Sequence, residues 1–159
     1  MKKAGDSEIK SIVASILKKG YLMSLATSDS AGPWISEIVY VSDSKFNIYW
    51  ISSAAARHSK AIQKNPKVAG SIVISDRPGQ KTEAIQILGR AKMLKGDSLA
   101  LARLRGKKLG VPIPKRQGET LVYNDKRYGG KHCWFKMTPT KFDILYKERF
   151  GDDKAVLEM

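Results

Sequence analysis

Residues 21–51 decide the fold, and they read YLMSLATSDSAGPWISEIVYVSDSKFNIYWI. Three apolar runs of strand length lie in this stretch: Tyr21–Thr27, Trp34–Val41 and Phe46–Ile51. The links between the runs are short and rich in Ser, Asp, Gly and Pro, which are the residues that make turns. Because strands joined by tight turns run antiparallel, the stretch predicts an antiparallel meander.

Further strands are expected downstream, at Val68–Ser75, at the long alternating segment Thr82–Leu94, and at the closing pair Cys133–Met137 and Lys141–Tyr146, joined through residues 138–140. Gly89 interrupts the alternating segment and predicts a bulge or a bend. Closure of a sheet removes its exposed edges, so about six or seven such strands favour a small closed barrel within a mainly β, α+β fold.

Helices are predicted where the apolar spacing changes. Ser7–Lys19 carries an apolar stripe at helical spacing and is expected to plug the core. Ala54–Lys64 is expected to be a short helix that ends before Pro66, and Asp97–Lys108 a further one. Residues 118–130 are polar and are expected to be turn-like.

The length and composition fit one globular domain over residues 1–159, with an N-terminal helix within 1–20 and a C-terminal tail at 147–159. Cys133 is the single cysteine and is interpreted as a core thiol; with only His58 and His132 beside it, no metal site is expected. The sequence has no apolar run of membrane-spanning length and no secretory signal pattern, so a cytoplasmic location is expected.

The charge balance indicates an anionic partner. Lys and Arg number 29 against 15 Asp and Glu, a formal net charge of +14 at pH 7. Such a balance suits a phosphorylated small molecule, nucleic acid or an anionic membrane surface, and it also confers solubility. The sequence lacks the interleaved aromatic residues of a platform for single-stranded nucleic acid, which argues against that class.

A candidate phosphate cradle lies at the end of the third strand. Ser52 and Ser53 end the strand, and Arg57, His58 and Lys60 follow on the first turns of the next helix. A helix start offers free N–H groups and a partial positive charge, and Arg can bind an anion with two hydrogen bonds. The residue types alone favour the other interpretation, a serine-capped surface helix with solvated basic residues.

Three stretches in order resemble one known family. YWISSAAARHSKAIQKNPKVA (49–69), ILGRA (87–91) and WFKMTPTKF (134–142) are similar to motifs of the pyridoxamine-phosphate-oxidase-like FMN-binding split barrels. The resemblance implies an antiparallel, Greek-key-like split barrel and a homodimer that binds FMN at its interface. It also implies an FMN-dependent oxidoreductase in which the cofactor carries the hydride or electron transfer.

The resemblance also implies which residues contact the cofactor. Ser52, Ser53, Arg57 and His58 would hold the FMN phosphate with help from Lys60, and the second strand would run beside the flavin ring at Ser36, Glu37, Ile38 and Val39. No catalytic side chain is identified. Vitamin B6 oxidation is not expected, because Ala84 stands where the family oxidases carry a Gln and their Arg-containing substrate motif is not recognisable.

Alternative functions stay open at this point. The same fold could hold a deazaflavin or haem, or bind a flavin without turnover, and a basic nucleic-acid-binding protein is a third class. The segment Arg103–Arg116 is basic without acidic neighbours. It is either a solvated helix face, a lid over an anionic co-substrate such as a nicotinamide nucleotide, or a nucleic-acid contact. We expect it to tune co-substrate affinity rather than FMN affinity.

Overall fold

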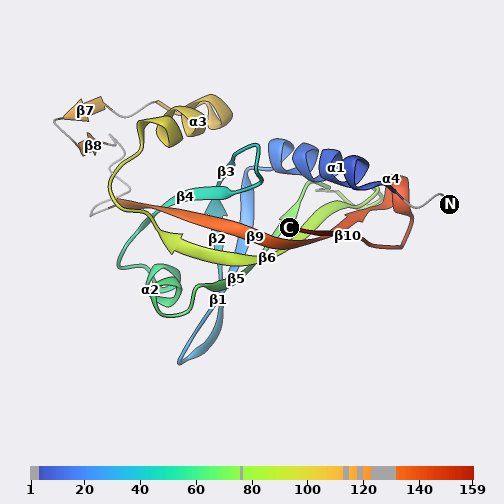
Figure 1. The fold of residues 1–159 in the computed structure, drawn as a ribbon, viewed down its shortest axis with the longest axis horizontal. Coiled ribbons are helices and arrows are strands. Elements are labelled where there is room, and N and C mark those ends of the chain that lie inside the picture. The colour runs from blue at the N-terminus through green and yellow to red at the C-terminus, as the bar shows by residue number, and fades with distance from the viewer. Residues whose placement is uncertain (1–3, 76, 113–114, 118–119, 123–131) are drawn as a thin grey trace.

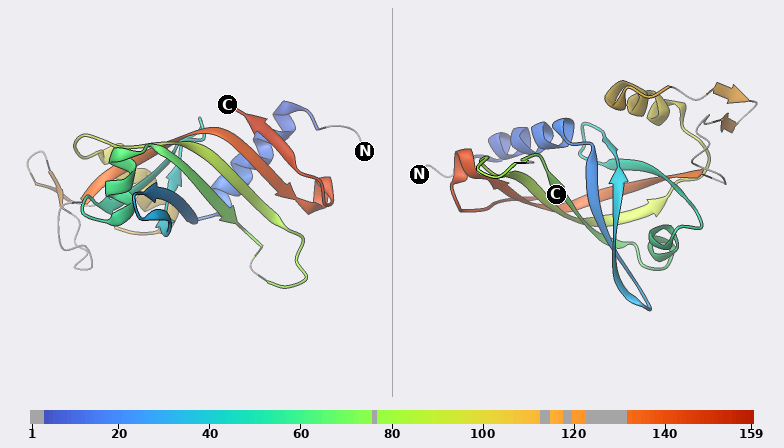
Figure 2. Two further views of the ribbon diagram at one scale, coloured as in Figure 1. Left: turned by 90° about the horizontal axis from the view of Figure 1, so that it is seen from below. Right: turned by 180° about the vertical axis from the view of Figure 1, so that it is seen from behind.

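The chain folds into a curled antiparallel sheet with helices packed around it (Figures 1 and 2). The computed structural model describes residues 4–75, 77–112, 115–117, 120–122 and 132–159. The strands are β1 (Leu22–Asp29), β2 (Gly32–Val39), β3 (Val41–Ser42), β4 (Ile48–Ser53), β5 (Lys67–Val73), β6 (Glu83–Met93), β7 (Lys115–Gln117), β8 (Thr120–Val122), β9 (His132–Tyr146) and β10 (Ala155–Glu158). The helices are α1 (Asp6–Lys19), α2 (Arg57–Lys64), α3 (Leu99–Leu109) and α4 (Lys147–Phe150).

The order of the strands explains why the sheet curls. The main path runs β2-β1-β5-β6-β9-β4-β3, with β10 paired to β9. β2 and β3 therefore lie at opposite ends of the path, yet only Tyr40 separates them along the chain. The two ends must come together at Tyr40, which confirms the expected mainly antiparallel split barrel of α+β class.

The expected meander is wrong in its second half. The segment expected as one strand, Trp34–Val41, divides at Tyr40 into β2, which pairs with β1, and β3, which pairs with β4 only at Val41 and Ser42. The first hairpin is also tighter than expected. β1 and β2 extend to the pair Asp29–Gly32, since pairing across the strands outweighs the turn preference of the flanking residues.

The closing hairpin expected at residues 138–140 is also wrong. β9 is continuous through Pro139 and pairs with β6 along most of its length. Its other edge pairs with β4 at residues 132–137 and with β10 at 141–144. Pro139 lies between these two partners, at the register shift opposite Leu88 and Gly89. A proline is tolerated at such a bulge, because the ladder is already interrupted there. The irregularity predicted at Gly89 is confirmed.

Several boundaries move for local reasons. β4 begins at Ile48 rather than Phe46, because Phe46 has φ 65° within the turn organised by Asp43. The second helix begins at Arg57 rather than Ala54, because Ala56 N–H donates to Ser53 O in a turn. α1 begins one residue earlier than expected.

Two further segments differ from expectation. The expected C-terminal tail is folded: α4 and β10 bury Phe150 and Leu157 against the core. Within the range expected to be turn-like, Thr120–Val122 forms β8 and pairs with β7. Residues 118–119 and 123–130 of that range, like 113–114 in the expected break after α3, lie outside the described residues. None of the helices in the described part of the chain is long and apolar enough to span a bilayer.

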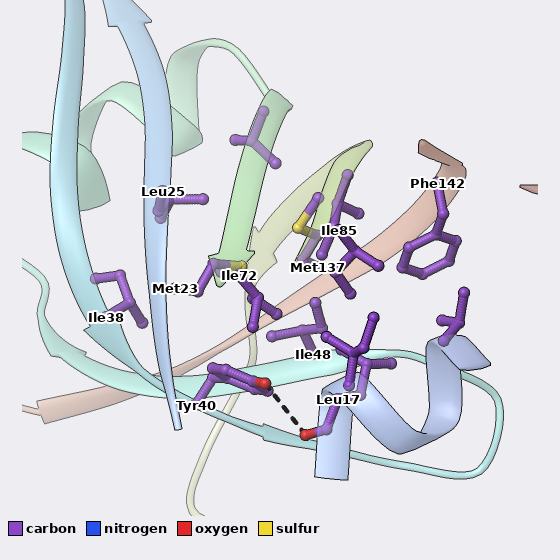
Figure 3. Close-up of a cluster of buried hydrophobic side chains, with 14 of the residues drawn as sticks. Leu17, Met23, Leu25, Ile38, Tyr40, Ile48, Ile72, Ile85, Met137 and Phe142 are labelled. Carbon is purple, nitrogen blue, oxygen red and sulfur yellow. Dashed lines mark hydrogen bonds between the residues drawn. The ribbon is translucent and has the colours of Figure 1, made fainter. Parts of the chain in front are cut away.

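The main core lies between α1 and the inner face of the sheet, as Figure 3 shows. Ile16 and Leu17 of α1 are buried against β-strand residues such as Ile72 and Phe142. Tyr40 is fully buried, and its hydroxyl donates to Leu17 O over 3.1 Å. The end of α1 is therefore attached to the residue at which the sheet closes.

α3 packs on the other face of β3, β4 and β9. A small apolar cluster forms there around Val41, Ala102 and Trp134. Lys108 Nζ donates to Leu17 O over 2.8 Å and lies 4.0 Å from the Tyr40 ring centroid. Burial lowers the pKa of Lys108 to about 8. Lys108 is therefore a docking residue and is not part of the exposed charge expected of Arg103–Arg116.

We expect Gly89→Ala to destabilise the fold by about 1–3 kcal/mol, the typical cost of overpacking. A Cβ at Gly89 would lie 2.6 Å from Thr138 O and 3.1 Å from Pro139 Cα, both backbone atoms of the bulged strand. Urea denaturation measures the effect. Arg90→Ala, at the exposed neighbour, is the control and should stay within about 0.5 kcal/mol of the parent. A Gly89→Ala protein as stable as the parent would contradict this account.

Candidate functional site

The start of α2 is an open helix N-terminus. The first helical hydrogen bond runs from Lys60 N–H to Ala56 O, so the N–H groups of Arg57, His58 and Ser59 precede it. Of the described residues, none caps this end with a side chain, and the first turn contains no acidic residue. By contrast, Ser98 caps α3, and Asp6 and Glu8 lie in the first turn of α1. The positive end of α2 is thus left without an internal counter-charge from its own helix.

His58 connects both sides of the split. Its Nδ1 lies 3.2 Å from Ser36 Oγ on β2, and its Nε2 lies 2.7 Å from Ser52 Oγ on β4. Burial lowers the pKa of His58 below its ordinary value. A neutral imidazole has one donor and one acceptor, so one serine donates to the ring and the other accepts from it.

Ser52 and Ser53 do not form one pair of donors. Successive side chains of a strand point to opposite faces. Ser52 lies opposite Cys133, which packs against the main core, whereas Ser53 lies opposite His132. Ser53 Oγ accepts the Ala55 N–H over 3.2 Å and so serves the turn into α2.

Asp29 and Trp34, which the sequence did not indicate as site residues, hold Arg57 in place. Its Nε and Nη2 donate to the two carboxylate oxygens of Asp29, over 2.8 and 3.0 Å. The guanidinium also lies 4.4 Å from the centroid of the Trp34 ring, a cation–π contact. The hydrogen bonds from Arg57 and then from Ala31 N–H lower the pKa of Asp29 to about 2. Asp29 and Trp34 escaped prediction because they belong to a hairpin far from α2 in sequence.

The other predicted site residues are dispersed. Lys60 is exposed on α2. On β2, Ile38 points into the core, while Glu37 and Val39 lie on the opposite, exposed face. Glu37 accepts a hydrogen bond from Ser24 over 2.8 Å. The structure therefore brings Ser36, Ser52 and His58 together and separates the remaining members of the second-strand set.

The outer face of the sheet carries a groove, and its exposed apolar side chains alternate with polar ones such as Glu37 and Gln86. The exposed apolar side chains on this face are Leu22, Ile35, Val39, Val73, Leu88 and Val156. A groove of about 360 Å³ crosses the strands between Ile35 on β2 and Asp143 on β9. Small residues, among them Ala26 and Ala69, form part of its lining. Within the described ranges, no three His, Cys, Asp or Glu side chains gather as a metal cluster.

The chain belongs to the pyridoxamine 5'-phosphate oxidase family, whose model matches residues 9–146. It is 31% identical over 83 residues to the UPF0306 protein PM1958 of Pasteurella multocida, a match that covers 52% of this chain and 56% of the relative. It is 27% identical over 133 residues to the UPF0306 protein plu4501 of Photorhabdus laumondii, covering 77% and 93% respectively. The chain thus spans little more than half of the first of these relatives.

Solved structures share the fold. HutZ, the heme storage protein of Vibrio cholerae, superposes with a TM-score of 0.62 at 17% identity, over 92% of this chain and 91% of that one. A FAD-binding protein of Mesorhizobium loti superposes with a TM-score of 0.58 at 15% identity, over 81% and 86%. At such identities the likeness shows the fold alone.

The titration of His58 tests its place between the serines. Because burial lowers its pKa in the folded state, the unfolded chain takes up the proton first as the pH falls. The contribution of His58 to the free energy of unfolding is therefore fully present above about pH 6.5 and decreases as the pH falls below 6.5. We expect an NMR midpoint below 6.5 for the His58 ring, and a smaller loss of unfolding free energy from pH 7.5 to 5.5 in His58→Gln. A His58 midpoint at or above 6.5 would contradict the geometry.

Proposed function

We propose that this chain is an FMN-binding flavoprotein that acts as an FMN-dependent oxidoreductase, with the FMN phosphate at the start of α2. The open N-terminus of α2 carries the proposal: its leading N–H groups precede the first helical hydrogen bond, and no acidic residue lies in its first turn. A phosphate suits such a site because it accepts several hydrogen bonds and complements the positive end of the helix.

The side chains around this helix start supply the donor types that a phosphate needs. Ser52 and His58 lie side by side, Arg57 presents a guanidinium held in place, and Lys60 adds an exposed ammonium one turn further on. When bound, the flavin would supply hydride or electron transfer. The protein would bind the phosphate, orient the ring along β2 and exclude water. A deazaflavin nucleotide would satisfy the same donors.

The same geometry favours a flavin over haem as the ligand at α2. Haem iron takes an axial ligand such as a histidine ring nitrogen. Both ring nitrogens of His58 already lie within hydrogen-bond distance of serine hydroxyls. Coordination through His58 would break one of these contacts in a half-buried site. The visible spectrum after reconstitution separates the alternatives, since flavin bands support the proposal and a Soret band supports haem.

Flavin titration tests the phosphate assignment directly. We expect the protein to quench FMN fluorescence and to bind FMN more tightly than riboflavin, which lacks the phosphate. Arg57→Ala should weaken FMN binding by roughly thirtyfold, since hydrogen bonds to charged groups contribute about 1.5–3 kcal/mol. Riboflavin affinity should not change. If Arg57→Ala binds FMN as tightly as the parent, the phosphate does not bind at this end of α2.

We further propose a homodimer formed through the outer face of the sheet, where the exposed fraction of Ile35 is 65% and that of Leu88 is 52%. β2 supports this arrangement because it ends the sheet and is exposed over most of its length. Several exposed apolar side chains on one face of a sheet favour an interaction site there. A second copy would cover both these side chains and the edge of β2.

We expect Ile35→Lys to convert the dimer to a monomer, because a buried unpaired ammonium costs on the order of 3 kcal/mol or more. Light scattering measures the mass across a range of concentrations. Met93→Lys is the matched control, since Met93 is an exposed apolar residue of β6 on the opposite face. A parent protein that is monomeric at all concentrations would contradict the proposal, as would a dimer that survives Ile35→Lys.

The co-substrate is proposed to be an anionic small molecule that meets the exposed basic residues of α3. Arg103 and Lys107 are exposed on this helix, whereas Lys108 is engaged with Leu17. A field of exposed charges attracts anions and is screened by salt. The co-substrate interaction should therefore depend on ionic strength more than the flavin interaction does.

A further inference from the structure

Most side chains of the proposed phosphate site already have partners within the protein. Ser52 is hydrogen bonded to His58, and His58 is engaged through both ring nitrogens. Ser53 accepts from the turn at Ala55. Arg57 donates twice to Asp29. At Ser52 and His58 a phosphate must therefore replace internal contacts, and such an exchange of hydrogen bonds contributes little net affinity. What a phosphate gains is limited to the open N–H groups of α2 and the remaining donors of Arg57.

The negative charge of Asp29 also opposes the binding of a phosphate at Arg57. Its carboxylate forms the side-on pair with Arg57 and also accepts the Ala31 N–H over 2.9 Å. Arg57 has five N–H donors, so its remaining donors can still meet a phosphate. An anion that binds them shares one guanidinium with the Asp29 carboxylate. The two anions would then lie closer than the Debye length of about 8 Å, where salt screens little.

The position of Arg57 does not depend on the charge of Asp29 alone. The Trp34 ring lies along the guanidinium at 4.4 Å, and the backbone of Arg57 is part of α2. The single amide oxygen of an asparagine at position 29 could still accept from Arg57 Nη2 and from Ala31 N–H, which both donate to Oδ1 of Asp29. Asp29→Asn therefore removes the negative charge and the hydrogen bond from Arg57 Nε, while the Nη2 hydrogen bond and the Trp34 ring still hold the guanidinium.

We propose that the flavin nucleotide is a diffusible ligand, exchanged with solution rather than kept as a permanent prosthetic group, and that Asp29 weakens its hold by opposing the phosphate. This inference rests on the proposed function and defines the class of ligand more closely. The ligand would be a flavin phosphate that binds and dissociates as a substrate does. Asp29 acts through Arg57 and is a positioning and charge-setting residue, not a catalytic one.

The test compares Asp29→Asn with the parent by fluorescence titration of FMN and riboflavin. We expect FMN to bind about fivefold more tightly to Asp29→Asn, the size of a modest exposed charge interaction. Riboflavin affinity should be equal in both. Glu8→Gln is the matched control, because Glu8 forms the corresponding pair with Arg149 elsewhere in the molecule and should leave FMN affinity unchanged.

Retention of the cofactor gives an independent readout. After loading with FMN and gel filtration, the parent should emerge largely without flavin, and Asp29→Asn should keep a larger fraction. Thermal unfolding monitored by circular dichroism verifies that each variant is folded, and Asp29→Ser replaces Asp29→Asn if the latter is not.

The possible outcomes distinguish the role of Asp29, the exchange of the flavin with solution and the proposed function. Equal or weaker FMN binding by the folded position-29 variant overturns the role of Asp29. Parent protein that retains stoichiometric, non-exchanging FMN overturns the diffusible ligand. If neither parent nor variant binds FMN or riboflavin, the proposed function itself fails, and this inference fails with it. Tighter FMN binding with unchanged riboflavin binding supports it.

Discussion

The single residue Tyr40 connects β2 to β3, and this short connection fixes how the sheet closes and where the helices pack. These strands end the sheet at opposite sides, so one covalent link brings both ends together and leaves a split without ladder hydrogen bonds between β2 and β4. Tyr40 is buried at this point and donates to Leu17 O, the same carbonyl that accepts from Lys108. α1, α3 and the sheet closure therefore meet at one acceptor.

The split also defines the candidate site. His58 reaches from α2 to Ser36 on β2 and Ser52 on β4, and so spans two strands that the sheet does not join. A ligand bound at the start of α2 would contact both margins of the split at once. The split therefore brings the open start of α2 next to β2 without a glycine-rich loop.

Local patterns predicted the elements well where each depends on its own residues. The apolar spacing of α1, the alternation of β6 and the irregularity at Gly89 follow from side-chain periodicity and from steric limits at one position. Pro139 led to the wrong prediction of a hairpin at residues 138–140. A turn signal is local, whereas β9 pairs with other strands along both of its edges. Cross-strand pairing over many residues outweighs one missing donor at a bulge.

The antiparallel α+β class, the family and the concentration of basic residues at the start of α2 follow from residue types and their spacing alone. Which of those residues act together depends on the tertiary fold. It set Ser52 and Ser53 on opposite faces of β4, put His58 between Ser36 and Ser52, and paired Arg57 with Asp29. Such contacts join residues on different elements and depend on strand register and on the closure of the sheet. Local sequence patterns therefore do not predict them.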